Sequence, residues 1–300
     1  MYDVICVGDV AVDDVYHVDR LPGSDQKVHA RPLGRYLGGT TCNTAVALNV
    51  LGDRVLFVTL IGNDEEGEFI QEQFRNLGID FRSVQPDNIK TPTTQVLLAN
   101  NGEKAILLFF TAQEMELARS YFRGISLDGG RLAFTTLSLP VYEVLSEFKA
   151  PIVVSLEEPT LEWQPEAFTW AISHAHTLIL DLRAFQWIYH EQPTPLNLSN
   201  ERDKGSVENL IVTLGSQGSL AYSRKEGRTI VTPTIEIEAL DTTGAGDVFN
   251  AAFIHSYYIS GQPLEKALQY ANIVAAFSCE DHGPMLSQKA VQKANHLFGN

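Results

Sequence analysis

The sequence predicts an α/β protein with three layers, in which a mostly parallel sheet lies between helices and a small β lid is added. Five short apolar runs are typical of buried strands, and they lie at Val4–Val7, Leu132–Thr136, Ile152–Ser155, Leu178–Leu180 and Leu210–Leu214. Helical segments separate some of these runs, and such alternation favours parallel pairing through right-handed crossovers. Asn101-Gly102, between two extended apolar runs, predicts a hairpin that interrupts the alternation.

The first third of the chain follows this pattern element by element. The first strand ends at Gly8 and is followed by a group of acids, Asp9, Asp13, Asp14 and Asp19. Apolar residues at helical spacing then extend from Thr40 and Thr41 to Gly52, a stop signal for a helix. A strand over Arg54–Ile61 precedes "NDEEGEFIQEQFRNLG", an amphipathic helix with an acidic first turn and a terminal glycine.

The rest of the chain completes one domain over residues 1–300, with a lid contributed by about 15–37 and 94–110. Shorter helices are expected at Glu143–Phe148 and Pro165–Ser173. The last third is helical, over Asp247–Ser260, Pro263–Cys279 and Ser287–Phe298. Edge strands of the lid could pair with a second copy, so a homodimer through the lid is one expectation.

Composition limits the possible partners. The 300 residues carry 37 acids and 22 bases, a formal charge of −15, so the surface should repel nucleic acids and anionic membranes. We see no signal peptide and no window of about 18 apolar residues that would span a membrane. Three separated cysteines without a CxxC pattern fit a reducing cytoplasm. We therefore expect small-molecule ligands, and a phosphate would need local positive geometry.

The stretch "LDTTGAGDVFNAAF", Leu240–Phe253, offers such geometry. Gly244, Ala245 and Gly246 precede an apolar helix, and amides at a helix start attract anions. A dinucleotide site is disfavoured because Phe249 occupies the third glycine position, and the chain has no Gly-Lys pair for a P-loop. Asp247 would repel a phosphate unless it accepts the proton of an attacking hydroxyl. The pattern therefore favours phosphoryl transfer.

These motifs resemble a known family. "DTTGAGD" at Asp241–Asp247 is similar to the C-terminal signature of the ribokinase-like (PfkB) carbohydrate kinases. "GDVAVDDV", "LGGTTCNTAVALNVLG" and "LIGNDEEGEFI" resemble that family's N-terminal region in order and spacing, and "VTLGSQGSLAY" resembles its nucleotide-side strand and turn. The resemblance spans most of the chain.

The resemblance implies a role for each motif residue. Asp247 would be the general base, with the Gly244, Ala245 and Gly246 amides as the anion hole, and the cofactors would be ATP, Mg²⁺ and in some members K⁺. The expected sugar-binding residues are Asp13, Gly38, Gly39 and Asn43. The expected nucleotide-binding residues are Thr213, Gly215, Gly218 and Asn272, and Asp241 and Thr243 would lie at a monovalent-cation loop.

The chain also departs from the family pattern. Where many members have Asn-x-x-Glu near the magnesium and phosphates, this chain has Asp181 and Ala184. Glu157 and Glu158 follow the preceding strand, where sugar-acid kinases often have Asn. Thr40 stands where ribose kinases have Lys. These positions leave the metal ligands and the sugar open.

Three functions remain in view. The first is an ATP-dependent kinase of a small sugar. The second is a nucleoside kinase, with an aromatic wall supplied by Phe109, Phe110 or Tyr36 near the lid. The third is a ligand-binding protein that kept the fold and lost activity. Asp9 and Asp14 remain alternatives to Asp13 as the hydroxyl ligand.

Overall fold

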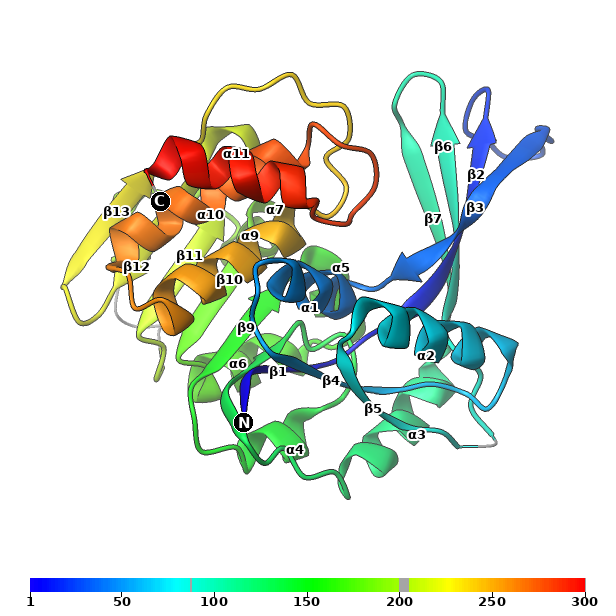
Figure 1. Cartoon of the computed structure of the whole chain (residues 1–300), viewed down its shortest axis with the longest axis horizontal. Helices are drawn as coiled ribbons and strands as arrows, with labels where there is room; N and C mark the ends of the chain where they lie inside the picture. Colours follow the sequence, from blue (N-terminus) through cyan, green and yellow to red (C-terminus); the bar gives the residue numbers. More distant parts are fainter. Residues whose placement is uncertain (87, 200–204, 300) are drawn as a thin grey trace.

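The computed structural model describes residues 1–86, 88–199 and 205–299, and its centre is a nine-stranded sheet (Figure 1). The strands lie in the order β13 (Arg228–Thr232), β12 (Ser219–Ser223), β11 (Asn209–Thr213), β10 (Thr177–Asp181), β9 (Ile152–Leu156), β8 (Gly130–Thr135), β1 (Tyr2–Val7), β4 (Val55–Leu60) and β5 (Asp80–Val84). Pairing is parallel from β11 to β5, as the alternation predicted, whereas β12 and β13 add on antiparallel. The mostly parallel α/β class is therefore confirmed.

Helices cover both faces of the sheet. They are α1 (Thr40–Val50), α2 (Glu65–Leu77), α3 (Ala112–Phe122), α4 (Tyr142–Ser146), α5 (Glu158–Trp163), α6 (Glu166–His174), α7 (Leu182–Tyr189), α8 (Pro195–Leu198), α9 (Ala245–Ile254), α10 (Leu264–Ser278) and α11 (Gln288–Phe298). Alternate residues of β1 serve the two layers. Val4 and Cys6 join the core under α1 and α9–α11, and Ile5 and Val7 join the core under α3–α7.

A second sheet of four strands extends away from this body (Figure 1). Its order is β3 (Ala30–Gly38), β2 (Ala11–Val18), β6 (Thr93–Ala99) and β7 (Lys104–Phe109). The predicted hairpin at Asn101-Gly102 joins β6 to β7, and β2 pairs with β6 in parallel, with Asp13 opposite Thr94. Because β2 follows β1 almost directly and β3 leads into α1, this small sheet is attached at the carboxyl end of β1.

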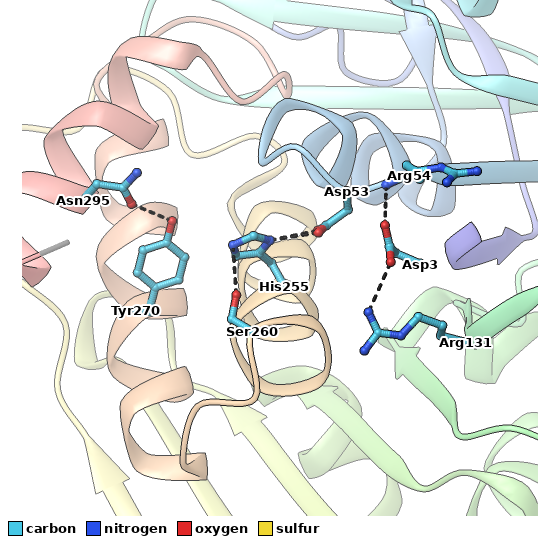
Figure 2. A network of polar contacts seen from close by, with 8 residues as sticks. All are labelled: Asp3, Asp53, Arg54, Arg131, His255, Ser260, Tyr270 and Asn295. Carbon is cyan, nitrogen blue, oxygen red and sulfur yellow. Dashed lines mark hydrogen bonds and ion pairs between the residues drawn. The ribbon is translucent and has the colours of Figure 1, made fainter. Parts of the chain in front are cut away.

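Helices α1 and α9 pack side by side and are joined at both ends. At their N-termini the Asn43 side-chain amide donates to Asp247 Oδ2 (2.8 Å). At their C-termini His255 Nδ1 lies 3.0 Å from both carboxylate oxygens of the buried Asp53 (Figure 2). Both helices therefore direct the positive ends of their dipoles to the same point.

The sequence predicted one continuous helix over Asp247–Ser260, and the structure corrects this. The α-helix ends at Ile254, and His255–Ile259 forms a π-helical turn. His255 Nε2 approaches Ser260 Oγ (3.5 Å) across this turn, while Tyr270 of α10 donates to Asn295 of α11 (2.9 Å) (Figure 2). The His255 ring at this wider turn lies beside Asp53, and the spacing of apolar residues in the sequence could not predict this contact.

Candidate active site

A cavity of about 780 Å³ opens at the carboxyl end of the large sheet. It is lined by the segments that follow β1, β8, β9, β10 and β11, by the N-termini of α1 and α9, and by one face of the small sheet. Along the chain, β1 leads to β4 and β5 in one direction, and β8 to β11 extend in the other. The cavity therefore lies at the topological switch point, where open α/β sheets bind ligands.

Asp247 lies at the inner end of this cavity, in the first turn of α9. Burial raises the pKa of its carboxyl group well above the usual value, and the nearby carboxylate of Glu157 raises it further. The hydrogen bond from Asn43 acts in the opposite direction. Asp247 is therefore a base with raised proton affinity, facing a space that a ligand can fill.

The Gly-Ala-Gly turn forms the start of α9. Gly244 has φ of 75°, and a Cβ there would lie 2.7 Å from Pro284 atoms, so both the conformation and the space require glycine. The amide of Ala245 donates to Thr242 O (3.3 Å), while the amides of Gly246 and Asp247 precede the first intrahelical bond, Val248 N–H to Gly244 O. Among the described residues no side chain caps this helix. Its open amides face the cavity and can bind an anion.

Asp13 and Asn43, two of the residues expected to bind the sugar, both line the cavity. Asp13 Oδ1 accepts from Thr94 Oγ1 (2.7 Å), and burial raises the pKa of this carboxyl. Asn43 is only 8% exposed, and its Oδ1 has no hydrogen-bond partner among the described residues. Gly39 lines the cavity, whereas Gly38 lies outside it, where a Cβ would fall 2.1 Å from Asp13 Oδ1. Gly38 thus makes room for the Asp13 carboxylate.

The other two acids near β1 are engaged elsewhere. Asp9 accepts from the amides of Thr40 (2.9 Å) and Thr41 (3.1 Å) and from three threonine hydroxyls, so it caps α1. Asp14 pairs with Arg35 (3.0 Å) near the surface. Asp13, by contrast, lines the cavity and, within the described part of the chain, accepts a single side-chain hydrogen bond, from Thr94.

The four residues expected to bind the nucleotide divide into two groups. Thr213 and Gly215 line the cavity. Gly218 and Asn272 lie outside it, and the Asn272 amide donates to Ser219 Oγ (3.0 Å) and Thr232 O (3.1 Å). The side chain of Asn272 therefore holds β12 and β13 to α10.

The two residues expected at a cation loop lie behind the α9 turn. Thr243 lines the cavity, and its amide donates to Asp241 Oδ1 (2.9 Å), while Gly283 N–H donates to Asp241 Oδ2 (2.9 Å). Burial acts to raise the pKa of Asp241, but these hydrogen bonds outweigh it and the pKa is lowered. The Asp241 carboxylate is thus ionised beside the Gly-rich turn.

Charged residues that the motifs did not assign also line the cavity. Lys104, on β7, donates to Thr243 Oγ1 (3.1 Å), so the small sheet carries a cation to the α9 turn. Burial, and after it the charges of Asp181 and Asp9, raise the pKa of the Glu157 carboxyl to about 7, and Glu157 in turn raises the pKa of Asp247. Arg183 lines the opposite side, in the first turn of α7. No pattern in the sequence signalled Lys104, since it and Glu103 are simply the two charged residues of the hairpin.

Asp181 and Ala184 occupy the positions at which many family members have Asn-x-x-Glu. Asp181 lines the cavity and its Oδ1 accepts from Ala184 N (2.6 Å), which caps α7. Ala184 is fully buried. Of the three aromatic residues expected near the lid, Phe110 lines the cavity, whereas Phe109 and Tyr36 lie outside its lining and are half exposed.

Known proteins share this sequence and this fold. The model of the pfkB family carbohydrate kinases matches residues 1–290. A nucleoside kinase of Methanocaldococcus jannaschii is 25% identical, with 94% of this chain and 92% of that protein aligned. A deoxyribokinase of Salmonella typhimurium is also 25% identical, over 99% of this chain and 98% of that protein.

Solved structures agree on the fold. A ribokinase from Thermotoga maritima superposes with a TM-score of 0.78 at 22% identity, covering 99% of this chain and 100% of that chain. An Arabidopsis thaliana ribokinase, solved with ribose and ATP, gives 0.74 at 21% identity with 98% of both chains covered. The chain therefore belongs to the pfkB family of carbohydrate kinases, and its reaction is the transfer of a phosphoryl group to an alcohol.

Proposed function

We propose that the chain is an ATP-dependent kinase that transfers the γ-phosphate to a hydroxyl of a small sugar or sugar derivative. The observation that carries this proposal is the corner where the buried Asp247 carboxyl adjoins the open amides of α9. The names of the relatives support it, since they include ribokinase, deoxyribokinase and nucleoside kinase.

In the proposed reaction the acceptor hydroxyl lies beside the Asp247 carboxylate, which the Asn43 amide holds by a hydrogen bond. The unpaired Asn43 Oδ1 and the Asp13 carboxylate accept hydrogen bonds from sugar hydroxyls. Asp247 removes the proton of the attacking hydroxyl while the γ-phosphate moves in line. The amides of Gly246 and Asp247, with the α9 dipole, stabilise the charge on the transferred group. Gly244 and Ala245 shape this anion hole.

Lys104 completes the phosphate site from the small sheet, which we propose acts as a lid. Its ammonium group lies against Thr243 in the α9 turn, where it can bind the transferring phosphate. The same contact brings β7 down on the cavity. Closure would exclude water and so limit hydrolysis of ATP.

We propose ATP with Mg²⁺ as the cofactor, and K⁺ near Asp241 and Thr243. Within the described part of the chain no group of three or more metal-binding side chains is formed. Mg²⁺ would therefore be held mainly by nucleotide phosphates and waters, with Asp181 and Glu157 as protein carboxylates, and it would neutralise phosphate charge. Thr213 and Gly215 would contact the nucleotide, and Gly218 and Asn272 would support that region from behind.

Two further proposals concern assembly and location. The small sheet has two edge strands, and Leu33 and Tyr36 on β3 and Phe109 on β7 are exposed, so a second copy could pair there as a homodimer. Within the described residues no helix combines the length and apolar character needed to span a bilayer. Its three buried, unpaired cysteines and its use of ATP support the cytoplasm as its place of action.

The Asp247→Asn variant tests the proposed function. The amide keeps the shape and the hydrogen-bonding partner but cannot accept the hydroxyl proton. We expect kcat to fall about 10²- to 10⁴-fold while the affinity for ATP stays within a few-fold. ADP release by the pure protein, measured over sugars and nucleosides, reports turnover. Activity of the variant close to wild type would remove Asp247 as the base, and ligand binding without any product would favour the inactive binding protein.

A further inference from the structure

The charge of the cavity wall limits the acceptor, a point that rests on the proposed function. Of the described lining residues, five are acids, Asp9, Asp13, Glu157, Asp181 and Asp247. Two are bases, Lys104 and Arg183. Lys104 is engaged at Thr243 in the α9 turn, and Arg183 lies by Asp181 at the nucleotide end. The acceptor end thus combines aspartates with no free cation, and an anionic acceptor would be repelled there.

The same end of the cavity has a broad apolar wall. On the small sheet, alternate residues point to the cavity: Thr94 and Val96 on β6, and Lys104, Ile106 and Leu108 on β7. Ile106 and Leu108 are 54% and 53% exposed. Phe110, Met115 and Leu139 continue the wall. An exposed apolar lining is covered favourably by a ligand with an apolar surface of its own.

Trp163 adds a flat aromatic surface at the rim. It is the last residue of α5, it lines the cavity and 54% of it is exposed. The next residue, Gln164, is buried and bonds to Leu137 O and to the Tyr142 hydroxyl (2.9 Å), just beyond β8. Because β8 lies beside β1, these bonds hold Trp163 on the side of Asp13 rather than of Thr213.

We propose that the acceptor is an uncharged sugar that carries a flat apolar substituent, the chemical class of a nucleoside. Its hydroxyls would bind Asp13 and Asn43, and its substituent would lie between Trp163 and the β7 residues Ile106 and Leu108. Free sugars would leave the apolar wall uncovered. Sugar acids and sugar phosphates would bring a negative charge to an end of the cavity that already holds carboxylates.

The test compares acceptors that share one sugar. ADP release is measured with ribose, methyl β-riboside, adenosine, ribonate and ribose 5-phosphate, with product formation confirmed by mass spectrometry. We expect kcat/KM for adenosine to exceed that for ribose about 10- to 100-fold, with the methyl riboside between them. The two anionic compounds should be the poorest acceptors.

Matched variants locate the effect. Leu108→Ala and Trp163→Ala should lower kcat/KM for adenosine about tenfold and leave that for ribose within about threefold. Leu107→Ala is the control, since Leu107 is the next residue of β7, is 50% exposed and faces away from the cavity. Thermal unfolding of each variant confirms that it is folded.

The outcomes separate this inference from the proposed function. Efficient use of ribose, ribonate or ribose 5-phosphate relative to adenosine would overturn the inference while leaving the kinase intact. Equal losses for ribose and adenosine in Leu108→Ala would overturn it as well. If none of these five compounds yields product, this inference fails, and the proposed function fails as well if the wider panel of sugars and nucleosides also yields none.

Discussion

The Glu157→Gln substitution measures how much the buried acid that lines the cavity lowers the free energy of unfolding at high pH. Burial raises the pKa of this carboxyl from 4.5 to about 7 in the folded chain. Below pH 4.5 the folded and unfolded chains both hold the proton, and its stabilising effect is fully present. As the pH rises through 7 the folded chain must ionise a group that the unfolded chain ionised earlier, so stability is lost.

The size of the effect follows from these two values. Between pH 5 and pH 8 the wild type should lose up to about 2.5 kcal/mol of unfolding free energy that the glutamine variant does not lose. Part of the side chain opens on the cavity, so solvent reduces this value rather than increasing it. The charge of Asp181 also raises the pKa of Glu157 and so adds to this loss of stability. In the glutamine variant Asp247 no longer faces the charge of Glu157, which further favours the variant at high pH.

Unfolding in guanidinium chloride at pH 5, 6.5 and 8 measures the difference for the free enzyme. Glu162→Gln is the control, because Glu162 lies exposed on the same helix, and its substitution should change stability by less than about 0.5 kcal/mol at each pH. A wild-type-minus-variant difference that stays constant across this range would refute the assignment of a raised pKa to Glu157.

Three further pairs of measurements follow from the site. Asp9→Ala should lower the unfolding free energy by about 1–3 kcal/mol because α1 loses its cap. Asp13→Asn should keep the unfolding free energy within about 1 kcal/mol of wild type and raise the KM of the acceptor about tenfold or more. Denaturant unfolding and initial rates distinguish the two variants, and equal stabilities would contradict the capping role of Asp9. Gly244→Ala should destabilise the folded chain by about 1–3 kcal/mol, because residue 244 has a positive φ and the new Cβ would contact Pro284. Gly246→Ala should fold normally, because a Cβ there meets open space, but it should weaken ATP binding in calorimetry. A fully active Gly246→Ala variant would argue against close approach of a phosphate to the α9 turn. Lys104→Met should lower kcat about 10- to 100-fold and shift the acid limb to higher pH, since the lysine charge lowers the pKa of Asp247 and Glu157; an unchanged kcat would show that the lid cation does not reach the phosphate.

Local signals in the sequence predicted much of this molecule. Gly78 ends α2 in the left-handed conformation, with φ of 68°, and Ser287 caps α11, as such residues do at helix ends. The Gly-Ala-Gly turn is local as well, since residues 244–247 contain both the amides and the carboxylate. Apolar runs predicted the strands but not their direction, because burial has the same pattern in parallel and antiparallel pairs. The apolar pattern therefore could not predict that β12 and β13 pair antiparallel.

The rest of the site depends on contacts between distant segments. The register of β2 against β6 and of β6 against β7 decides that Ile106 and Leu108 face the cavity and Phe109 faces away. Lys104 reaches Thr243 across 139 positions of sequence for the same reason. The family resemblance implies that Asn272 binds the nucleotide, yet its side chain bonds to β12 and β13. A motif locates a segment, and only packing decides which side chains it presents.

The hydrogen bond between Asn43 and Asp247 has a consequence for synthesis of the protein. Its two residues are 204 positions apart, so the proposed catalytic corner cannot assemble on the ribosome until about five-sixths of the chain has emerged. The described strands of both sheets, β1–β13, are all made before residue 247 and can already pair. A nascent chain would thus form most of its two sheets while still unable to transfer a phosphoryl group, and catalysis would begin only after α9 packs against α1.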